Sequence, residues 1–547
     1  MNAHSSHAKA RATDRNTKRG GRKRVFISVL AIAVVMSACS SGSSISTAQG
    51  SSAPVSGGTA DVAIVSDPPT LDWTYSTSTI THEVSWNIFE QLFALDKQYT
   101  LRPMLAEGFT MSPDGLVYTL PLRKDVHFQN GQPMTADDVI ASLKRWGSIS
   151  SPGKQVSARI ADTTAPDSHT VVITLKQPYS PLIPDLASPD QAAIVLPASI
   201  ARAAGEKPLS DQQVVGTGPY KLKQWKRGQV VQLAKWNDYV PLPASDDWGG
   251  LAGHKAAYID QINFRVTPDP SVRVSGLQTG EFTVSTELSS DSYDQLKQSS
   301  SAQPVLIDPA AAMYIVFNKR KPPFTDVTMR EAINLVSNKK QIAASAFGDP
   351  KFWSLDSSMF FPPQATLHTD AGDSAYKAYD PTKAADLMKR AGYDFNRPIR
   401  ILTTKTYPYM YNAGVALAQE LDSIGIKTDV QVYDWPTDLA RRMDDSSWDV
   451  FITTFAVEFD PTQLLWISPS YNGWYDSPKM QSALAGWAKA NTMPEKQAAL
   501  QLIQTIEWQE LPAVKVANRT ILDGASTKLQ NFKPYLDVVL WNTWLSQ

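Results

Sequence analysis

Short runs of β-branched and aromatic residues, each bounded by turn residues, recur along most of this chain and limit the folds open to it. Such runs are typical of β-strands. Their spacing leaves room for helices between many of them, which favours a mixed α/β fold over a helical bundle. We expect strands at 60–65, 116–122, 169–176, 220–225, 229–236, 262–266, 313–318, 399–404, 428–433 and 448–455.

Helix signals stand between several of these runs. Capping sequences or an Asp-Pro or Ser-Pro pair precede segments 139–146, 382–391 and 479–490, and a glycine follows segment 415–424. Helices and strands alternate most clearly from 325 to 450, whereas 60–290 is richer in strands. The chain therefore predicts two unlike lobes.

Composition excludes several classes of protein. The 547 residues include 52 Lys+Arg, 53 Asp+Glu and one Cys, so an iron–sulfur cluster and an intrachain disulfide framework are ruled out. Few histidines are present, and those after residue 38 lack the helical spacing of a two-His metal site. We expect no cofactor, no resident metal and no nucleic-acid partner.

The N-terminus has the pattern of an export signal. Residues 1–24 contain eight basic residues and one acidic residue. The apolar run 25–36 that follows would be about 18 Å long as a helix, which is too short to span a bilayer core of roughly 30 Å. The run ends in Met36-Ser37-Ala38-Cys39, which resembles the lipobox of bacterial lipoproteins. The resemblance implies that residues 1–38 are a cleaved signal peptide and that Cys39 carries lipid.

Residues 39–58 are rich in Ser and Gly and are expected to form a flexible tether. Removing 1–38 takes away eight basic residues and one acidic residue, leaving 44 Lys+Arg against 52 Asp+Glu, a net charge of about −8. That charge is unsuited to binding nucleic acid or anionic lipid. We expect an extracytoplasmic protein that is held at a bacterial membrane by its lipid anchor.

Several long blocks resemble bacterial extracellular solute-binding protein family 5, the peptide and nickel group of ABC-transporter receptors. The blocks run in family order from about residue 60 to the C-terminus. They are residues 87–146, 215–225 (VGTGPYKLKQW), 264–282, 317–342, 379–393 (YDPTKAADLMKRAGY) and 421–435 (LDSIGIKTDVQVYDW).

The resemblance implies a periplasmic-binding-protein-like fold with an enlarged lobe I. Lobe I would comprise 59–309 and the C-terminal return 515–547, and lobe II would comprise 310–514. Two crossing segments would act as a hinge, and the cleft between the lobes would close on a small solute. Permease and ATPase subunits would be the protein partners, and the receptor would be a monomer.

The resemblance also implies ligand contacts in lobe II. In peptide-binding members an Asp four residues before a proline anchors the peptide ammonium, but here Val457 stands four residues before Pro461. Glu458 is adjacent and is a candidate substitute, although neighbouring side chains on a strand point to opposite faces. Trp435 and Phe455 match aromatic positions that can lie against ligand.

Further candidate contacts lie on expected loops. Tyr407 and Tyr409 stand on a Pro-containing segment and offer flat apolar faces with hydroxyl groups. Thr74, Tyr75 and Thr77 align with a lobe I loop that touches solute in several members; their hydroxyls could instead cap a helix expected over 81–93. We expect the Arg441-Arg442 pair on a solvated helix face.

Three functions stay open at this stage. An importer receptor for a peptide leads, with oligosaccharides, opine-like compounds and metal chelates as alternative solutes. A lipid-anchored hydrolase is second; the sequence lacks G-x-S-x-G and H-E-x-x-H, so we expect no enzyme. The third is a surface receptor that reports solute to a membrane sensor or chaperones exported proteins.

Overall fold

The computed structural model describes residues 53–490 and 492–546, and the predicted signal peptide, Cys39 and most of the tether lie outside them. One sheet of 11 strands dominates the described part. Its main path is β15 (Thr428–Tyr433), β14 (Ile399–Thr404), β16 (Val450–Ala456), β12 (Ala302–Phe317), β17 (Ala513–Ser526), β11 (Val284–Ser285), β1 (Thr59–Ile64), β10 (Gln261–Val266), β9 (Val230–Lys235) and β8 (Tyr220–Lys226), with β13 (Trp353–Ser354) paired to β17.

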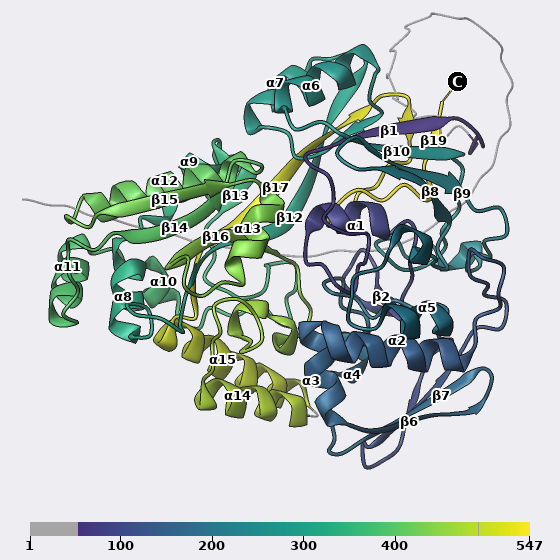
Figure 1. The fold of residues 1–547 in the computed structure, drawn as a ribbon, viewed down its shortest axis with the longest axis horizontal. Coiled ribbons are helices and arrows are strands. Elements are labelled where there is room, and N and C mark those ends of the chain that lie inside the picture. The colour runs from purple at the N-terminus through teal and green to yellow at the C-terminus, as the bar shows by residue number, and fades with distance from the viewer. Residues whose placement is uncertain (1–52, 491, 547) are drawn as a thin grey trace, which may run out of the picture. The chain divides into compact units, whose positions relative to one another are not determined.

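Two long strands, β12 and β17, connect the two ends of this sheet (Figure 1). They pair antiparallel from Ala302↔Ser526 to Val316↔Ala513. The register shifts between Ile307 and Ala311, close to the predicted crossing after residue 309. The α/β fold and its two-lobed type agree with the prediction, and the residue bounds of the lobes stay a prediction.

The part of the chain from 325 to 456 alternates helices with strands, as predicted. Parallel pairing of β14 with β15 and β16 requires helical crossovers between them. The helices of this part are α8 (Val327–Val336), α9 (Lys339–Phe347), α10 (Asp373–Lys377), α11 (Pro381–Arg390), α12 (Pro408–Asp422) and α13 (Trp435–Arg442), followed by α14 (Pro478–Lys489) and α15 (Met493–Glu510).

The N-terminal part carries a second sheet of four antiparallel strands. Its order is β4 (Thr110–Met111), β5 (Val117–Pro121), β7 (Thr170–Leu175) and β6 (Ile160–Asp167). The other strands form the pairs β2 (Phe93–Leu95) with β3 (Leu101–Pro103) and β18 (Leu529–Gln530) with β19 (Trp544–Leu545). The helices here are α1 (Thr79–Ser85), α2 (Ala136–Ile149), α3 (Ser151–Arg159), α4 (Leu182–Leu186), α5 (Ala198–Ala204), α6 (Pro270–Thr279) and α7 (Tyr293–Lys297).

The predicted helix starts are confirmed by their capping contacts. The Asp380 carboxylate accepts the Lys383 backbone N–H at 2.9 Å, and the Ser477 hydroxyl accepts that of Met480 at 3.2 Å. Two local predictions are wrong. The Tyr407–Tyr409 segment is the start of α12 rather than a loop, because Pro408 occupies its first turn. The helix expected over 81–93 ends at Ser85.

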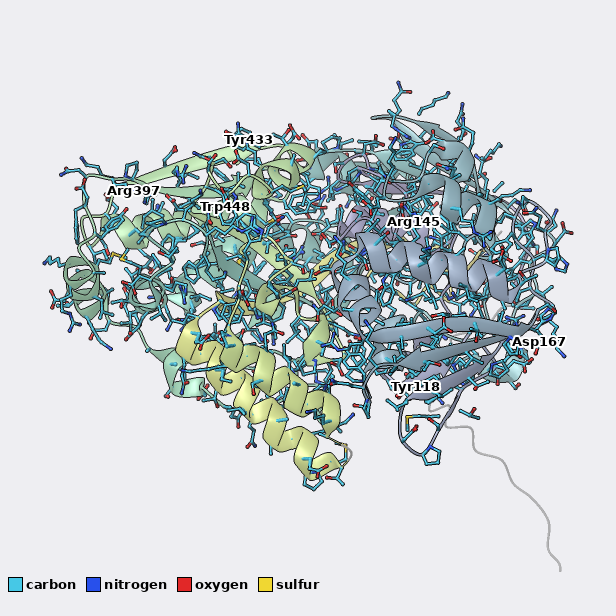
Figure 2. The ribbon with its side chains drawn as sticks, turned by 60° about the horizontal axis from the view of Figure 1, so that its bottom comes forward. Tyr118, Arg145, Asp167, Arg397, Tyr433 and Trp448 are labelled. Carbon is cyan, nitrogen blue, oxygen red and sulfur yellow. The ribbon has the colours of Figure 1, made fainter. Side chains whose placement is uncertain are left out.

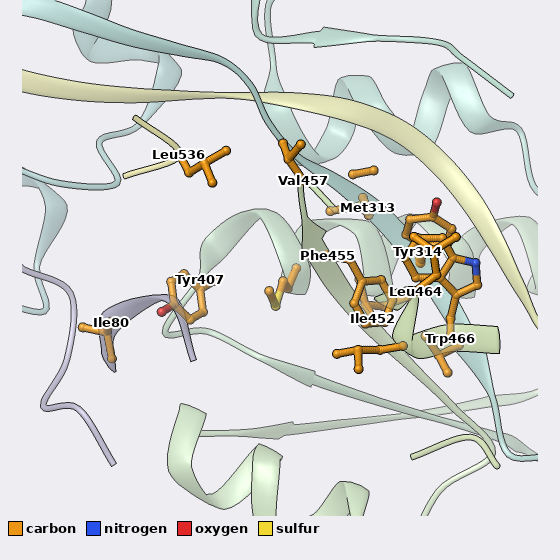
Figure 3. Packing of buried hydrophobic residues seen from close by; sticks show 14 of the residues in the cluster. Ile80, Met313, Tyr314, Tyr407, Ile452, Phe455, Val457, Leu464, Trp466 and Leu536 are labelled. Carbon is orange, nitrogen blue, oxygen red and sulfur yellow. The ribbon is translucent and has the colours of Figure 1, made fainter. Parts of the chain in front are cut away.

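None of the helices in the described ranges is both long and apolar enough to cross a bilayer. The core instead packs around the long strands. Tyr314, Phe455 and Trp466 pack together there (Figure 3), with ring centroids 4.4 Å apart for Tyr314 and Trp466 and 4.9 Å for Phe455 and Trp466. Such contacts hold the C-terminal end of β16 in place.

Ion pairs join chain segments in both parts of the molecule, and Figure 2 labels Arg145 and Arg397, which supply the cations of two of them. Arg145 on α2 donates to Asp72 at 2.5 Å. Arg397 donates to the buried carboxylate of Asp449, the residue just before β16, at 2.8 Å. Because both partners of the Arg145 pair are almost fully buried, losing one would leave an unpaired charge in the core.

A close backbone approach requires glycine at position 216. A Cβ there would lie 2.0 Å from the Ile88 carbonyl oxygen, and the same oxygen accepts the Gly218 N–H at 2.8 Å. The Gly-Thr-Gly turn thus packs its backbone against the segment that follows α1. No other residue type fits without movement of that backbone.

We expect Gly216→Ala to lower the free energy of unfolding by about 3 kcal/mol, because the added methyl group overpacks against backbone. Urea unfolding of the two proteins measures the difference. Gly486→Ala is the control, since Gly486 is an exposed position in α14 with open space around it, and it should gain about 0.5 kcal/mol. Equal stability of Gly216→Ala and wild type would contradict the packing argument.

The stability of the fold depends on the protonation of a carboxyl that is buried between predicted lobe I and predicted lobe II. Asp185 accepts the Tyr179 hydroxyl at 2.7 Å and the Thr462 hydroxyl at 3.2 Å. Burial, reinforced by the nearby carboxyl of Asp460, raises the pKa of Asp185 to about 8. An unfolded Asp titrates near about 4, so the folded protein binds the extra proton between these values.

A folded state that binds more protons than the unfolded chain loses stability as pH rises. We therefore expect the free energy of unfolding to fall between about pH 4 and about pH 8, and Asp185→Asn to make this decline shallower. Urea unfolding at several pH values between 5 and 8.5 measures it. Asp422→Asn, at an exposed site, should keep the wild-type slope; an unchanged slope in Asp185→Asn would refute the assignment.

Candidate functional site

An enclosed cavity lies where segments 59–309, 310–514 and 515–547 come together. Its volume is about 70 Å³, and the surrounding space that is continuous with solvent brings the total to about 860 Å³. Helix α1 supplies Thr79 and His82, strand β16 supplies 453–456, and strand β17 supplies Arg519 and Ile521. Its walls therefore come from residues that are far apart in the sequence.

Most of the predicted contact residues line this cavity, and they come from separate elements. They are Thr77, Tyr407, Tyr409, Trp435 and Phe455. Figure 3 shows Tyr407 and Phe455 on two different segments.

Three predicted residues lie outside the cavity wall. The Thr74 hydroxyl is buried and donates to the Ala192 carbonyl at 2.8 Å, and Tyr75 is 45% exposed to solvent. Glu458 is buried behind the wall, near Asp190, which does line the cavity. The helix-capping alternative for the 74–77 hydroxyls is also not seen, because Ser78 is the residue at the start of α1.

Aromatic rings form much of the wall. The Tyr407 and Trp435 rings meet edge to face at a centroid distance of 5.1 Å, and Phe455 meets Tyr471 in the same way at 5.5 Å. The Trp435 indole N–H donates to the Ser78 hydroxyl at 3.0 Å. This hydrogen bond joins predicted lobe II to predicted lobe I beside the cavity.

The expectation of a solvated Arg441-Arg442 pair is wrong for Arg442. Its guanidinium is buried and donates to Asp438 at 2.5 Å and to the Thr453 hydroxyl at 3.0 Å. The i, i+4 spacing on α13 brings the two charges together. This cation of the cavity wall is thus already neutralised.

A second cation, Arg519, is also paired within the protein. Its guanidinium makes a bidentate ion pair with Glu287, with one of the two hydrogen bonds at 3.0 Å, and lies 3.7 Å from the centroid of the Tyr409 ring. Glu287 adopts a left-handed backbone conformation with φ of 54°, which is uncommon for a residue with a side chain. The pair closes one end of the cavity.

A group of buried carboxyls stands next to that ion pair. Glu83, Asp523 and Asp537 are all at least 97% buried, and Asp537 lines the cavity. Burial raises the pKa of each, that of Asp523 to about 7, and their mutual repulsion raises the pKa values of Glu83 and Asp537 further. A hydrogen bond joins the Glu83 and Asp537 side chains, which requires a proton on one of them.

At the other end the wall contains an uncharged histidine. Burial lowers the pKa of His82 to about 4, and its Nε2 lies 3.3 Å from the Ser76 carbonyl oxygen, to which it donates. The His82 ring stacks on Trp86 at 5.8 Å. Asp190 lies 3.7 Å from His82 Nε2, so it faces a neutral ring rather than a cation.

These groups suit the binding of a polar solute with apolar surface. Aromatic faces, hydroxyls and carboxyls converge on one enclosed space. Within 53–490 and 492–546, no cluster of three or more His, Cys, Asp or Glu has the arrangement of a metal site.

The sequence-based predictions missed several wall residues, namely His82, Trp86, Asp190, Glu287, Arg519 and Asp537. Strand β17 itself was missed. Its run 513–526 mixes apolar residues with Lys515, Arg519 and Asp523, so no clear strand pattern identifies it in the sequence.

Comparison with known proteins identifies the family. A family profile described as bacterial extracellular solute-binding proteins, family 5 Middle, matches residues 100–476. A probable peptide ABC transporter periplasmic-binding protein of Sinorhizobium fredii is 27% identical, covering 83% of this chain and 87% of its own length. The glutathione-binding protein GsiB of Escherichia coli K12 is 28% identical, covering 86% and 91%.

A solved structure has the same fold. The periplasmic binding protein AgaA of A. tumefacien R10, in complex with agropinic acid, superposes with a TM-score of 0.78 at 22% identity, covering 90% of this chain and 99% of its own. Because the matched profile spans well over half of the sequence, the chain belongs to the bacterial extracellular solute-binding proteins of family 5.

Proposed function

We propose that this protein is the extracytoplasmic receptor of an ABC importer and that it binds a peptide-like solute in the cavity described above. Membership of a family of solute-binding proteins supports the receptor role. The names of the two relatives, a peptide transporter component and a glutathione-binding protein, support a peptide-like solute.

The observation that carries the proposal is a cavity whose wall is drawn from both predicted lobes. His82 and Glu287 come from the first part of lobe I, Trp435 and Phe455 from lobe II, and Arg519 from the C-terminal return. A solute that touches both lobes stabilises the closed arrangement by its differential affinity for it. The boundaries 59–309, 310–514 and 515–547 are part of this proposal.

The proposed solute contacts are the predicted residues that line the cavity. The rings of Tyr407, Tyr409, Trp435 and Phe455 would pack on apolar parts of the solute, and the Thr77 hydroxyl would hydrogen-bond to its polar atoms. The proposal does not extend to Thr74, Tyr75 or Glu458 as direct contacts, because they do not line the space.

We further propose that lipid on Cys39 anchors the receptor outside the cytoplasm and that it works as a monomer with permease and ATPase subunits. The basic n-region, the apolar run 25–36 and the lone cysteine support the anchor. Two or more acyl chains hold a protein at a membrane much better than one.

Native mass spectrometry of the purified protein tests the receptor role. After unfolding and refolding to remove any solute, the protein should retain masses from a protease digest of casein, and the released compounds should be unchanged. Retention of no peptide from the digest, with oligosaccharides, opines or metal chelates retained when they are offered instead, would overturn the peptide assignment. Conversion of the retained compound into a product would overturn the receptor role in favour of a hydrolase.

The Trp435–Ser78 hydrogen bond should strengthen solute binding by stabilising the closed arrangement. Trp435→Phe keeps an aromatic ring but removes the donor, and we expect an affinity loss of about five- to tenfold, since one neutral hydrogen bond contributes about 1 kcal/mol. Isothermal titration calorimetry with a retained peptide measures it.

The control is Trp353→Phe, which removes an indole hydrogen bond to the Gly348 carbonyl within the same lobe. It should leave the affinity unchanged. Ser78→Ala should add nothing to the loss in Trp435→Phe if the two residues act through this bond. Additive losses in the double variant would contradict the bridging role.

A further inference from the structure

Asp190, a carboxyl of the cavity wall, lacks a counter-charge. The cations Arg442 and Arg519 are occupied by Asp438 and Glu287. Asp190 lines the cavity and is about 91% buried, yet its Oδ1 has no hydrogen-bond partner in the described ranges. A buried charged oxygen without a partner is costly, so this position is prepared for a group that the protein itself does not supply.

The groups that face Asp190 do not neutralise it. His82 is uncharged at neutral pH, and the Arg442–Asp438 pair lies beyond Tyr471 with no net charge. Glu458 faces Asp190 from the other predicted lobe, and it too has a buried oxygen, Oε2, without a partner. Burial raises the pKa of Asp190 to about 7, so a solute cation would favour its ionised form.

An unpaired donor accompanies this unpaired acceptor. Trp86 lines the same cavity, and its buried indole Nε1 has no hydrogen-bond partner in the described ranges. Both groups contact His82, through ring stacking for Trp86 and at 3.7 Å for Asp190. Asp190 and Trp86 are thus separated by about one side chain. A single solute that carries a cationic donor and a neighbouring hydrogen-bond acceptor can therefore bind to both.

Aromatic rings contribute to the same cavity wall. Trp86, Trp435 and Tyr471 all line the cavity. Rings of this kind attract ammonium and guanidinium groups through their faces, and the attraction grows where water is excluded. A carboxylate among aromatic rings therefore selects a cationic group over a neutral one of similar shape.

We propose that Asp190 anchors a positively charged amino group of the solute, while Trp86 Nε1 donates to a carbonyl or carboxylate oxygen beside that amino group. The solute class is thus an amine with a neighbouring acceptor, as at the free amino end of a peptide. The assignment rests on the proposed function and adds the feature of the solute that is recognised.

The test compares two forms of one casein digest on the refolded full-length protein. One form keeps its free amines, and in the other all amines are acetylated with acetic anhydride. Native mass spectrometry should show retention from the free-amine digest and at least tenfold less from the acetylated digest, since a charge-assisted hydrogen bond changes affinity by about ten- to a hundredfold. Equal retention from both forms would overturn the cationic anchor while leaving a peptide receptor in place.

Variants assign the anchor to its residue. Asp190→Asn should lose the preference for free amines, and Trp86→Phe should weaken retention while keeping that preference. Asp445→Asn, on the surface beside Arg320 and Lys321, should behave like wild type. Loss of the preference in Asp537→Asn but not in Asp190→Asn would overturn the assignment to Asp190.

Folding is checked separately by circular dichroism and thermal unfolding. If Asp190→Asn does not fold, the wild-type comparison of the two digests still decides whether the anchor recognises a cation. Asp190→Ser, which also removes the carboxyl, then tests the position: loss of the preference supports the assignment, and a retained preference overturns it. Retention from neither digest by wild type would refute the proposed peptide receptor itself, and this inference with it.

Discussion

The antiparallel pairing of β12 with β17 is the constraint on which the rest of the structure depends. These strands lie side by side from Ala302 to Val316, and the sheet continues from them in both directions. Because the backbone hydrogen bonds of both strands are satisfied by each other and by their neighbours, the sheet joins parts of the chain that would otherwise be separate units. The cavity is built directly on these strands, through Ala310, Ala311, Arg519 and Ile521.

The electrostatics of the cavity follow from this arrangement. Its two guanidinium groups are fully engaged by carboxylates of the protein, whereas carboxyls remain in excess at both ends. A buried carboxyl must either hold a proton or find a cation. In an empty cavity the buried acids therefore favour their protonated forms. A solute cation removes the cost of burying an unpaired carboxylate, so the same interaction selects the charge of the solute and favours closure.

The aromatic wall adds affinity with little loss of freedom. Tyr407, Trp435, Phe455 and Tyr471 are held by ring contacts with one another or by hydrogen bonds. Side chains that are already ordered lose little entropy when a solute binds. The hydrogen bond between Trp435 and Ser78 joins the two predicted lobes. The position of the Trp435 ring is therefore coupled to the closed arrangement.

Much of the fold could be predicted from local patterns, because the periodicity of strands and the caps of helices depend on residues that are close together in the sequence. The strands from 60–65 to 448–455 and the helices after Asp380 and Ser477 are where the sequence placed them. The site was only partly predictable. Tyr407, Trp435 and Phe455 were found through motifs, but the loop expected around Tyr407 is a helix start.

By itself the sequence determined the mixed α/β class, the position of most elements, the family and the aromatic residues of the wall. Only the tertiary structure decided which charges meet. Asp190, Glu287 and Arg519 are separated by long stretches of chain, and the strand that carries Arg519 has no alternating pattern to reveal it. Whether a buried charge is paired or free depends on neighbours that folding alone brings within a few ångströms.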